Sequence, residues 1–321
     1  MPTEKFADNT PPARIEERVH DWLSRQGYPL EFRTAAEFSK AGFQVRQGGY
    51  VSDTRSGKLR EIDVLADVPR RYVNQPARIC YVVECKWSRE KPWIIFTSSD
   101  KVTSGVTISQ TIASELGRLL LWAAAGDSRL NSTRTFGASD KPCFGGRQAF
   151  SDGADLVFSA LQSVVSVAKA KADDWNKRLE YEQSLSQDLL PRVGVILLPI
   201  IVIEGRLFEA RLEGADLLLE EVSSSRVHWR GSETWEHIAT VDIVTIDYLE
   251  AFVSCRASEV NIICEALQTY YDSLCSCCEH LDLGEFEITP GPRGFFDVPP
   301  LLKRLNHALA VRRGVVPPRK R

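Results

Sequence analysis

The sequence predicts an α/β fold in which helices cover a mixed β-sheet, and three features indicate it. A helix at about 30–41 precedes short apolar runs between residues 43 and 87 that are typical of strands. An amphipathic helix at about 154–175 carries apolar residues at helical spacing. The aliphatic run 193–203 that follows it is typical of a strand covered on both faces.

The composition excludes several classes of protein. Of the 321 residues, 43% are hydrophobic and 26% are charged, which supports a large core and excludes global disorder. The net charge of −3 excludes a generally basic nucleic-acid coat, although it is compatible with a local basic groove. The longest apolar run is well short of the roughly 20 residues of a membrane-spanning helix, and the polar first residues lack the apolar segment of a signal peptide. We therefore expect a cytoplasmic protein without membrane contact.

The N-terminal part is predicted to be a helix followed by a meander of strands. Residues 1–27 form a disordered lead-in and a first helix, which Gly27 ends. The helix at 30–41 ends at Gly42, and a strand begins at Phe43. Turn residues at 53–58 precede two further strands, at 59–68 and 79–87.

The rest of the chain is predicted to complete the sheet and extend it. The core of the fold is predicted to span 28–205. It contains an insertion at 97–146, with one helix within 108–125 and a polar loop. Residues 206–321 are predicted to be a C-terminal α/β elaboration packed on this core. Its expected elements are a hairpin within 207–222 that turns at Glu213 and Gly214, a buried strand at 239–246, and helices near 256–281 and 299–312.

Charged residues interrupt two of the predicted strands, and this is the informative feature of the sequence. Side chains alternate faces along a strand, so Glu84 and Lys86 share one face of the strand at 79–87 with the apolar Val82. Asp63 lies in the preceding strand. Charges in apolar strands are costly to desolvate unless they are paired or bind a metal. The alternative is that these charged residues simply lie on a half-exposed, solvated face of the sheet.

The upstream helix offers a third acid, either Glu31 or Glu37. Glu37 has Arg33 and Lys40 at helical spacing and is predicted to lie on a charged, solvated face. Glu31 shares a stripe with Ala35 and Phe38 that is predicted to face the core, where a carboxylate needs a partner.

Three acids and an amine suit metal-assisted hydrolysis of a phosphodiester. Oxygen ligands in a small, open site favour Mg²⁺, which keeps several of its waters, with Mn²⁺ as a substitute. The Lys86 side chain could orient an attacking water, deprotonate it as the neutral amine, or neutralise charge on the phosphate as the ammonium.

These residues resemble the PD-(D/E)xK motif of the restriction-endonuclease-like nuclease superfamily. The motif is carried by Glu31, Asp63 and the triplet Glu84-Cys85-Lys86, and the segment LEFRTAAEFSKAGFQV resembles the opening helix of the Mrr-like branch. The resemblance covers about 28–96 and extends less closely to 154–175 and 193–203. It departs from the family pattern in having Ile62 before Asp63 where the motif has proline.

The resemblance implies a restriction-endonuclease-like αβββαβ core and a Mg²⁺-dependent endonuclease. Asp63, Glu84 and the backbone carbonyl of Cys85 would be metal ligands, Glu31 a metal or supporting acid, and Lys86 the catalytic lysine. DNA is the implied partner, cut by a homodimer or a larger complex in restriction or anti-phage defence. The alternatives are a DNA-repair or junction nuclease, an RNA-cutting nuclease, and a binding scaffold that has lost activity.

Weaker candidates flank this motif. Contacts to nucleic-acid phosphates are predicted for Lys58, Arg60 and Arg89, although solvated loop charges explain each of them equally well. Gln148 follows two glycines, before the long amphipathic helix, and the resemblance implies that it assists the site or contacts nucleic acid from that helix. The cysteine-rich segment 275–280 lacks a second ligand pair for zinc, so we interpret its cysteines as small apolar side chains near the end of a helix. The eight cysteines of the chain are predicted to be reduced thiols, because the sequence has no secretory signal.

Overall fold

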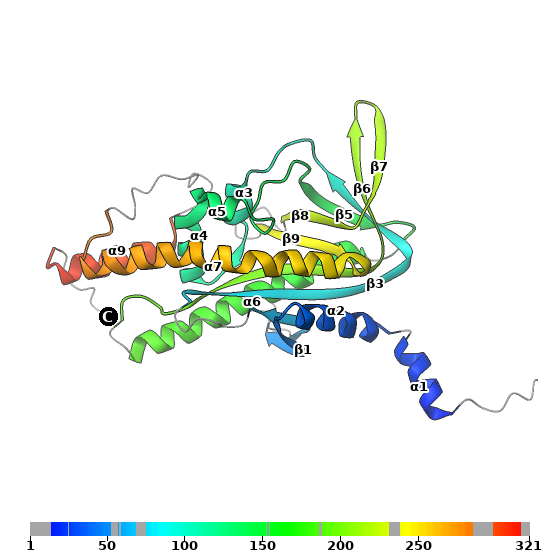
Figure 1. Ribbon diagram of the computed structural model, residues 1–321, viewed down its shortest axis with the longest axis horizontal. Helices are drawn as coiled ribbons and strands as arrows, with labels where there is room; N and C mark the ends of the chain where they lie inside the picture. Colours follow the sequence, from blue (N-terminus) through cyan, green and yellow to red (C-terminus); the bar gives the residue numbers. More distant parts are fainter. Residues whose placement is uncertain are drawn as a thin grey trace, which may run out of the picture.

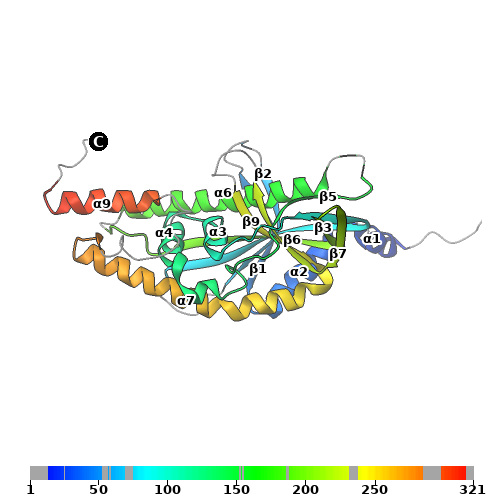
Figure 2. The same cartoon turned by 90° about the horizontal axis from the view of Figure 1, so that it is seen from above.

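The computed structural model describes most of the chain. The described residues are 14–24, 26–52, 57, 59–68, 75–151, 153, 155–185, 188–230, 238–284 and 298–315. For Arg89 and residues 183–185 it describes the backbone alone. Figure 1 shows the elements along the chain, and Figure 2 shows them from above.

Helices and strands alternate along the chain, as in an α/β protein. The helices of four residues or more are α1 (Ile15–Ser24), α2 (Tyr28–Lys40), α3 (Ser104–Ser109), α4 (Glu115–Ala123), α5 (Ser128–Asn131), α6 (Leu156–Leu185), α7 (Leu249–Glu279) and α9 (Pro300–Arg312). The strands are β1 (Gln44–Ser52), β2 (Leu59–Asp67), β3 (Ala77–Thr97), β4 (Ile112–Ala113), β5 (Cys143–Gln148), β6 (Gly194–Glu213), β7 (Asp216–Val222), β8 (Ser224–Arg230) and β9 (Ile238–Thr245).

These strands form one mixed sheet around β3 and β6. The sheet has the order β1-β2-β3-β5-β8-β9-β6-β4, with β7 also paired to β6. β3 and β6 run parallel over most of their length, whereas β1, β2 and β3 are antiparallel neighbours. Because β6 pairs with both β3 and β9, the strands β3, β5, β8, β9 and β6 form a closed ring of pairings.

Helices cover both faces of this sheet, which explains the apolar strands. Alternate residues of β3 enter two separate cores: Cys80 and Val82 pack with α6, and Ile79, Tyr81 and Val83 pack with α2 and α7. Figure 2 shows α6 on one side of the strands and α2 and α7 on the other. The predicted α/β class with a mixed sheet is therefore confirmed.

Several predicted elements are confirmed with longer boundaries. The strand predicted at 79–87 continues to Thr97, the helix at 154–175 continues to Leu185, and the apolar strand at 193–203 continues to Glu213. The predicted hairpin turn follows Glu213, where Gly214 has a positive φ of 65° that suits glycine. The predicted turn at 53–58 lies outside the described residues except for Gly57.

The segment 97–146 differs from its prediction as one helix and a loop. Its helical part is divided into α3 and α4 by the short strand β4, which pairs with β6. Ser114 begins α4 as its N-cap, and its Oγ also accepts a hydrogen bond from the backbone N–H of Val195 at 2.9 Å. The predicted polar loop contains α5 and the start of β5.

The predicted boundary between 205 and 206 falls inside β6, which runs without a break from Gly194 to Glu213. The elaboration after it also contributes β8 and β9 to the same sheet. No helix in the described part of the chain combines the length and the apolar character that crossing a membrane requires.

Candidate active site

The predicted acids meet where the pairing of β2 with β3 ends. The last registered pair of these strands is Val64 with Val83, and the next residues along the two strands are Asp63 and Glu84. The same edge of β3 pairs with β5 only from Trp93 onward. Within the described residues, the β3 segment between these two ladders has a strand partner only on its β6 side. The interruption leaves the two acids at an unpaired edge inside the sheet.

The Asp63 side chain bonds the β3 backbone at the point where the backbone pairing of β2 with β3 ends. Its Oδ2 accepts a hydrogen bond from the backbone N–H of Cys85 at 2.7 Å, which fixes one oxygen against β3. Burial, reinforced by the nearby charge of Glu84, raises the pKa of Asp63 to about 6. The Cys85 N–H and the Lys86 ammonium oppose this shift and are outweighed. Acids whose pKa values are shifted in this way are often found at functional sites.

Glu84 and Lys86 form a close ion pair on the α6 side of β3. Lys86 Nζ donates to Glu84 Oε1 at 2.5 Å, and Ser163 Oγ, on α6, donates to Glu84 Oε2 at 3.1 Å. Glu84 is only 8% exposed. Burial lowers the pKa of Lys86, but Glu84 and Asp63 outweigh it and the pKa is raised overall. The lysine is therefore charged at neutral pH, which suits it to neutralising a phosphate better than to accepting a proton.

Glu31 approaches the same acids from the first turn of α2. The buried Leu30, Thr34 and Phe38 hold this helix on the sheet, and Thr34 Oγ1 accepts a hydrogen bond from the Cys85 thiol at 3.6 Å. Burial, followed by the charge of Asp63, raises the pKa of Glu31 to about 7. The structure thus brings the acid of the core-facing stripe into the electrostatic field of the other two.

The alternative acid, Glu37, lies elsewhere. It pairs with Lys40 at 2.7 Å, as the helical spacing predicts. Arg33, its other predicted neighbour, instead lies 3.7 Å from Glu204 of β6. Glu37 therefore belongs to a local ion pair of α2.

The donor set suits a hard cation that keeps part of its water shell. In the described ranges, no group of three or more His, Cys, Asp or Glu side chains is arranged to hold a metal ion. In this part of the chain, Glu31, Asp63 and Glu84 are therefore not grouped as three side-chain ligands of one ion, and a zinc-type cage is absent as well. Two neighbouring carboxylates fit Mg²⁺, which is commonly bound through one or two carboxylates, waters and substrate phosphates. The Cys85 carbonyl stays a predicted ligand.

The predicted phosphate contacts are only partly described. Arg60 lies half-buried on β2, opposite Val51 of β1. Lys58 and the side chain of Arg89 lie outside the described residues. The backbone of Arg89 belongs to β3, where the register with β6 shifts.

Gln148 is not on a helix, and that part of its prediction is wrong. It ends β5, opposite Trp93, and its Nε2 donates to Ser88 Oγ at 2.8 Å. Ser88 Oγ in turn donates to the carbonyl of Lys91 at 2.6 Å. The segment before it pairs with β3 instead of beginning a helix, and Gly146 permits this because a side chain there would meet Ile94 and Ile95 of β3.

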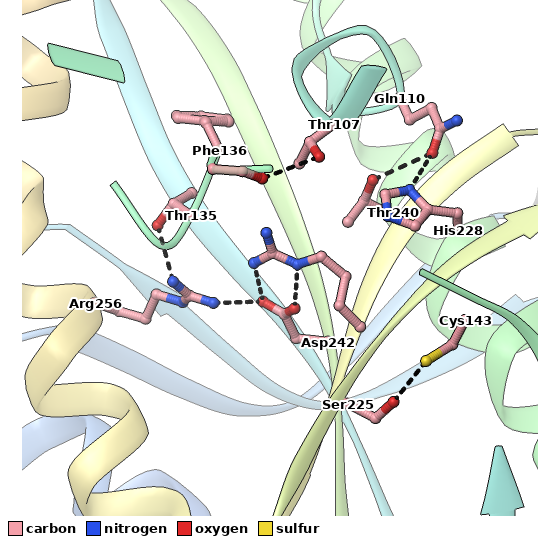
Figure 3. A network of polar contacts seen from close by, with 12 residues as sticks. Thr107, Gln110, Thr135, Phe136, Cys143, Ser225, His228, Thr240, Asp242 and Arg256 are labelled. Atoms are coloured by element: carbon pink, nitrogen blue, oxygen red, sulfur yellow. Dashed lines mark hydrogen bonds and ion pairs between the residues drawn. The ribbon is translucent and has the colours of Figure 1, made fainter. Parts of the chain in front are cut away.

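A second polar network, which sequence analysis did not find, lies in the ring of strands (Figure 3). Asp242 of β9 accepts hydrogen bonds from Arg226 at 2.8 and 3.1 Å and from Arg256 of α7 at 2.8 Å. Burial raises its pKa, but the two arginines outweigh it and lower the pKa to about 2. Arg256 also pairs with Glu259, which accepts a hydrogen bond from Thr135 Oγ1 at 2.7 Å. The charges are matched, so we interpret the network as a clamp between α7 and the sheet.

No protein-family model, curated protein or solved structure matches this sequence. The interpretation of the site therefore depends on its own geometry.

Ser163 is the contact to the site that sequence analysis missed. It lies on α6 next to Val164 and Val165, which are both buried, and its polar side chain among them is a weak signal. Nothing local in the sequence says that this part of α6 faces Glu84, since the contact joins residues 79 positions apart.

Proposed function

We propose that this protein is a Mg²⁺-dependent nuclease that hydrolyses DNA phosphodiester bonds. The observation that carries the proposal is the meeting of Asp63, Glu84 and Lys86 at the point where the β2–β3 ladder ends. Glu84 is buried and Asp63 is half-buried, and the lysine is held 2.5 Å from Glu84. The resemblance to the PD-(D/E)xK motif points to the same chemistry.

The residues divide into an acidic and a basic part. Asp63 and Glu84 would hold the cation, with the Cys85 carbonyl as a third oxygen and Glu31 as a supporting acid. A bound divalent ion would supply a Lewis acid that polarises the phosphate and lowers the pKa of water. Lys86 keeps its positive charge beside these acids and can stabilise the charge that develops on a phosphate oxygen.

A cleavage assay with a matched pair of lysine variants tests this proposal. Wild-type protein, Lys86→Ala and Lys91→Ala are incubated with duplex DNA, single-stranded DNA, branched DNA and RNA, with Mg²⁺, Mn²⁺ or EDTA. Lys91 is the control because it is exposed on the same strand, β3.

We expect the wild type and Lys91→Ala to cut DNA in the presence of a divalent ion. Lys86→Ala should lose roughly 10²–10³-fold in rate, as expected when one charge-stabilising group is removed, while thermal unfolding shows that it is folded. Cleavage by Lys86→Ala at the wild-type rate would refute the role of the lysine. If RNA or branched DNA is cut in preference to duplex DNA, that nucleic acid is the substrate instead. No cleavage of any substrate by the wild type contradicts the proposal.

A further inference from the structure

Each of the two acids in the candidate site has one carboxylate oxygen fixed by a hydrogen bond from the protein. Asp63 Oδ2 accepts from the backbone N–H of Cys85, and Glu84 Oε2 accepts from Ser163 Oγ. The remaining oxygen of Glu84, Oε1, accepts from Lys86. An ionised carboxylate has about four lone-pair sites, so Oε1 can accept from the lysine and still contact a cation.

The contact made by Ser163 is not one that its helix requires. Serine in a helix commonly donates to a carbonyl of the preceding turn. Ser159, one turn earlier on α6, does this and donates to the carbonyl of Leu156 at 3.0 Å. Ser163 instead reaches across to β3. Its neighbours Ala160 and Val164 are fully buried, and their packing holds this part of α6 against the sheet.

We propose that Ser163 is a positioning residue that orients the Glu84 carboxylate toward a divalent cation. By holding Oε2 on the α6 side, it leaves Oε1 facing Lys86 and the ion. Without this hydrogen bond, the carboxylate is free to rotate and to turn both oxygens toward Lys86. Hydrogen bonds that orient metal-binding side chains typically contribute 10–100-fold to metal affinity or activity. This inference rests on the proposed function, because it assumes that Glu84 binds a cation.

The test is a Mn²⁺ titration of the full-length protein, followed by the electron paramagnetic resonance signal of the free ion. Four proteins are compared: wild type, Ser163→Ala, Ser163→Thr and Ser159→Ala. Threonine keeps the hydroxyl, and Ser159→Ala removes a hydroxyl from the same helix without touching Glu84. The same proteins are assayed for DNA cleavage across a range of Mg²⁺ concentrations, and circular dichroism verifies their folding.

We expect Ser163→Ala to bind Mn²⁺ roughly 10-fold more weakly than the wild type and to need correspondingly more Mg²⁺ for cleavage. Ser163→Thr should recover most of the affinity, and Ser159→Ala should match the wild type. If Ser163→Ala binds Mn²⁺ as tightly as the wild type, or if Ser163→Thr binds as weakly as Ser163→Ala, the positioning role is wrong while the nuclease proposal stands. A wild type that neither binds Mn²⁺ nor cuts DNA overturns both.

Discussion

Replacing Asp63 by asparagine should stabilise the metal-free protein while abolishing its activity. The pKa of this carboxyl is raised from 3.8 to about 6 by burial and by Glu84. Asparagine keeps an oxygen that can accept the hydrogen bond from Cys85, and it removes the charge that the fold disfavours. At about 1.4 kcal/mol for each tenfold change in proton affinity, the charged carboxylate costs the folded state about 3 kcal/mol above pH 7.

The sign of the pH dependence follows from the raised pKa. Between pH 3.8 and about 6 the folded chain binds the proton of Asp63 more tightly than the unfolded chain, so this group makes the protein less stable as the pH rises. The advantage of Asp63→Asn should therefore be about 3 kcal/mol at pH 8, about half of that at pH 5, and close to zero near pH 3.

Urea unfolding in EDTA at pH 5 and pH 8 measures both quantities, and repeating it with Mg²⁺ tests the origin of the cost. Added Mg²⁺ should stabilise the wild type more than Asp63→Asn, because an ion that binds the folded state adds to its stability. An Asp63→Asn protein that is less stable than the wild type at pH 8, or an advantage that is the same at both pH values, would refute the reasoning.

Three further changes test the fold. Arg256→Met removes a buried partner of Asp242 and should cost roughly 3–5 kcal/mol in urea unfolding; a loss below about 1 kcal/mol contradicts the clamp. Because the pKa of Asp242 is lowered to about 2, its contribution to the free energy of unfolding is present above pH 3.8 and is lost as the pH falls through 2. Asp242→Asn should therefore destabilise the protein more at pH 6 than at pH 3 in the same urea experiment, and an equal effect at both pH values contradicts this. Gly146→Ala should lower the free energy of unfolding by roughly 1–3 kcal/mol, because the added methyl would lie 2.6 Å from a backbone oxygen of β3. Gly145→Ala is the control, because a methyl there meets nothing within 4 Å, and equal stabilities of the two variants would refute this.

The acidic strands could be predicted because their signal is local. Glu84 and Lys86 share a face through the alternation of a strand, and a charge in an apolar strand stands out in the sequence. The choice of Glu31 over Glu37 depended on helical periodicity, which is also local. In the structure Lys86 pairs with Glu84 and Glu37 pairs with Lys40, whereas the roles of the site residues, the metal and the reaction are proposals.

The features that sequence analysis missed depend on contacts between distant segments. Ser114 is indistinguishable from a helix-interior serine until its Oγ is seen to cap α4 and to accept from the backbone of Val195. The strand that ends at Gln148 is missed because the close approach of Gly146 to β3 is a property of the sheet and not of the local sequence. The clamp around Asp242 joins α7 to β8 and β9, which no periodicity predicts.

The two halves of the candidate site differ in how firmly they are held. β3 stays in register with β6 without interruption from Ala77 to Ser88, whereas the ladder between β2 and β3 ends at Val64. Among the described strands, the start of β2 pairs with β1 alone. In a hydrogen–deuterium exchange experiment, the β3 amides that bond β6 should exchange much more slowly than the amides at the start of β2. A cation shared by Asp63 and Glu84 would thus link the start of β2 to β3. Its binding would be detected as slower hydrogen exchange of the β2 amides.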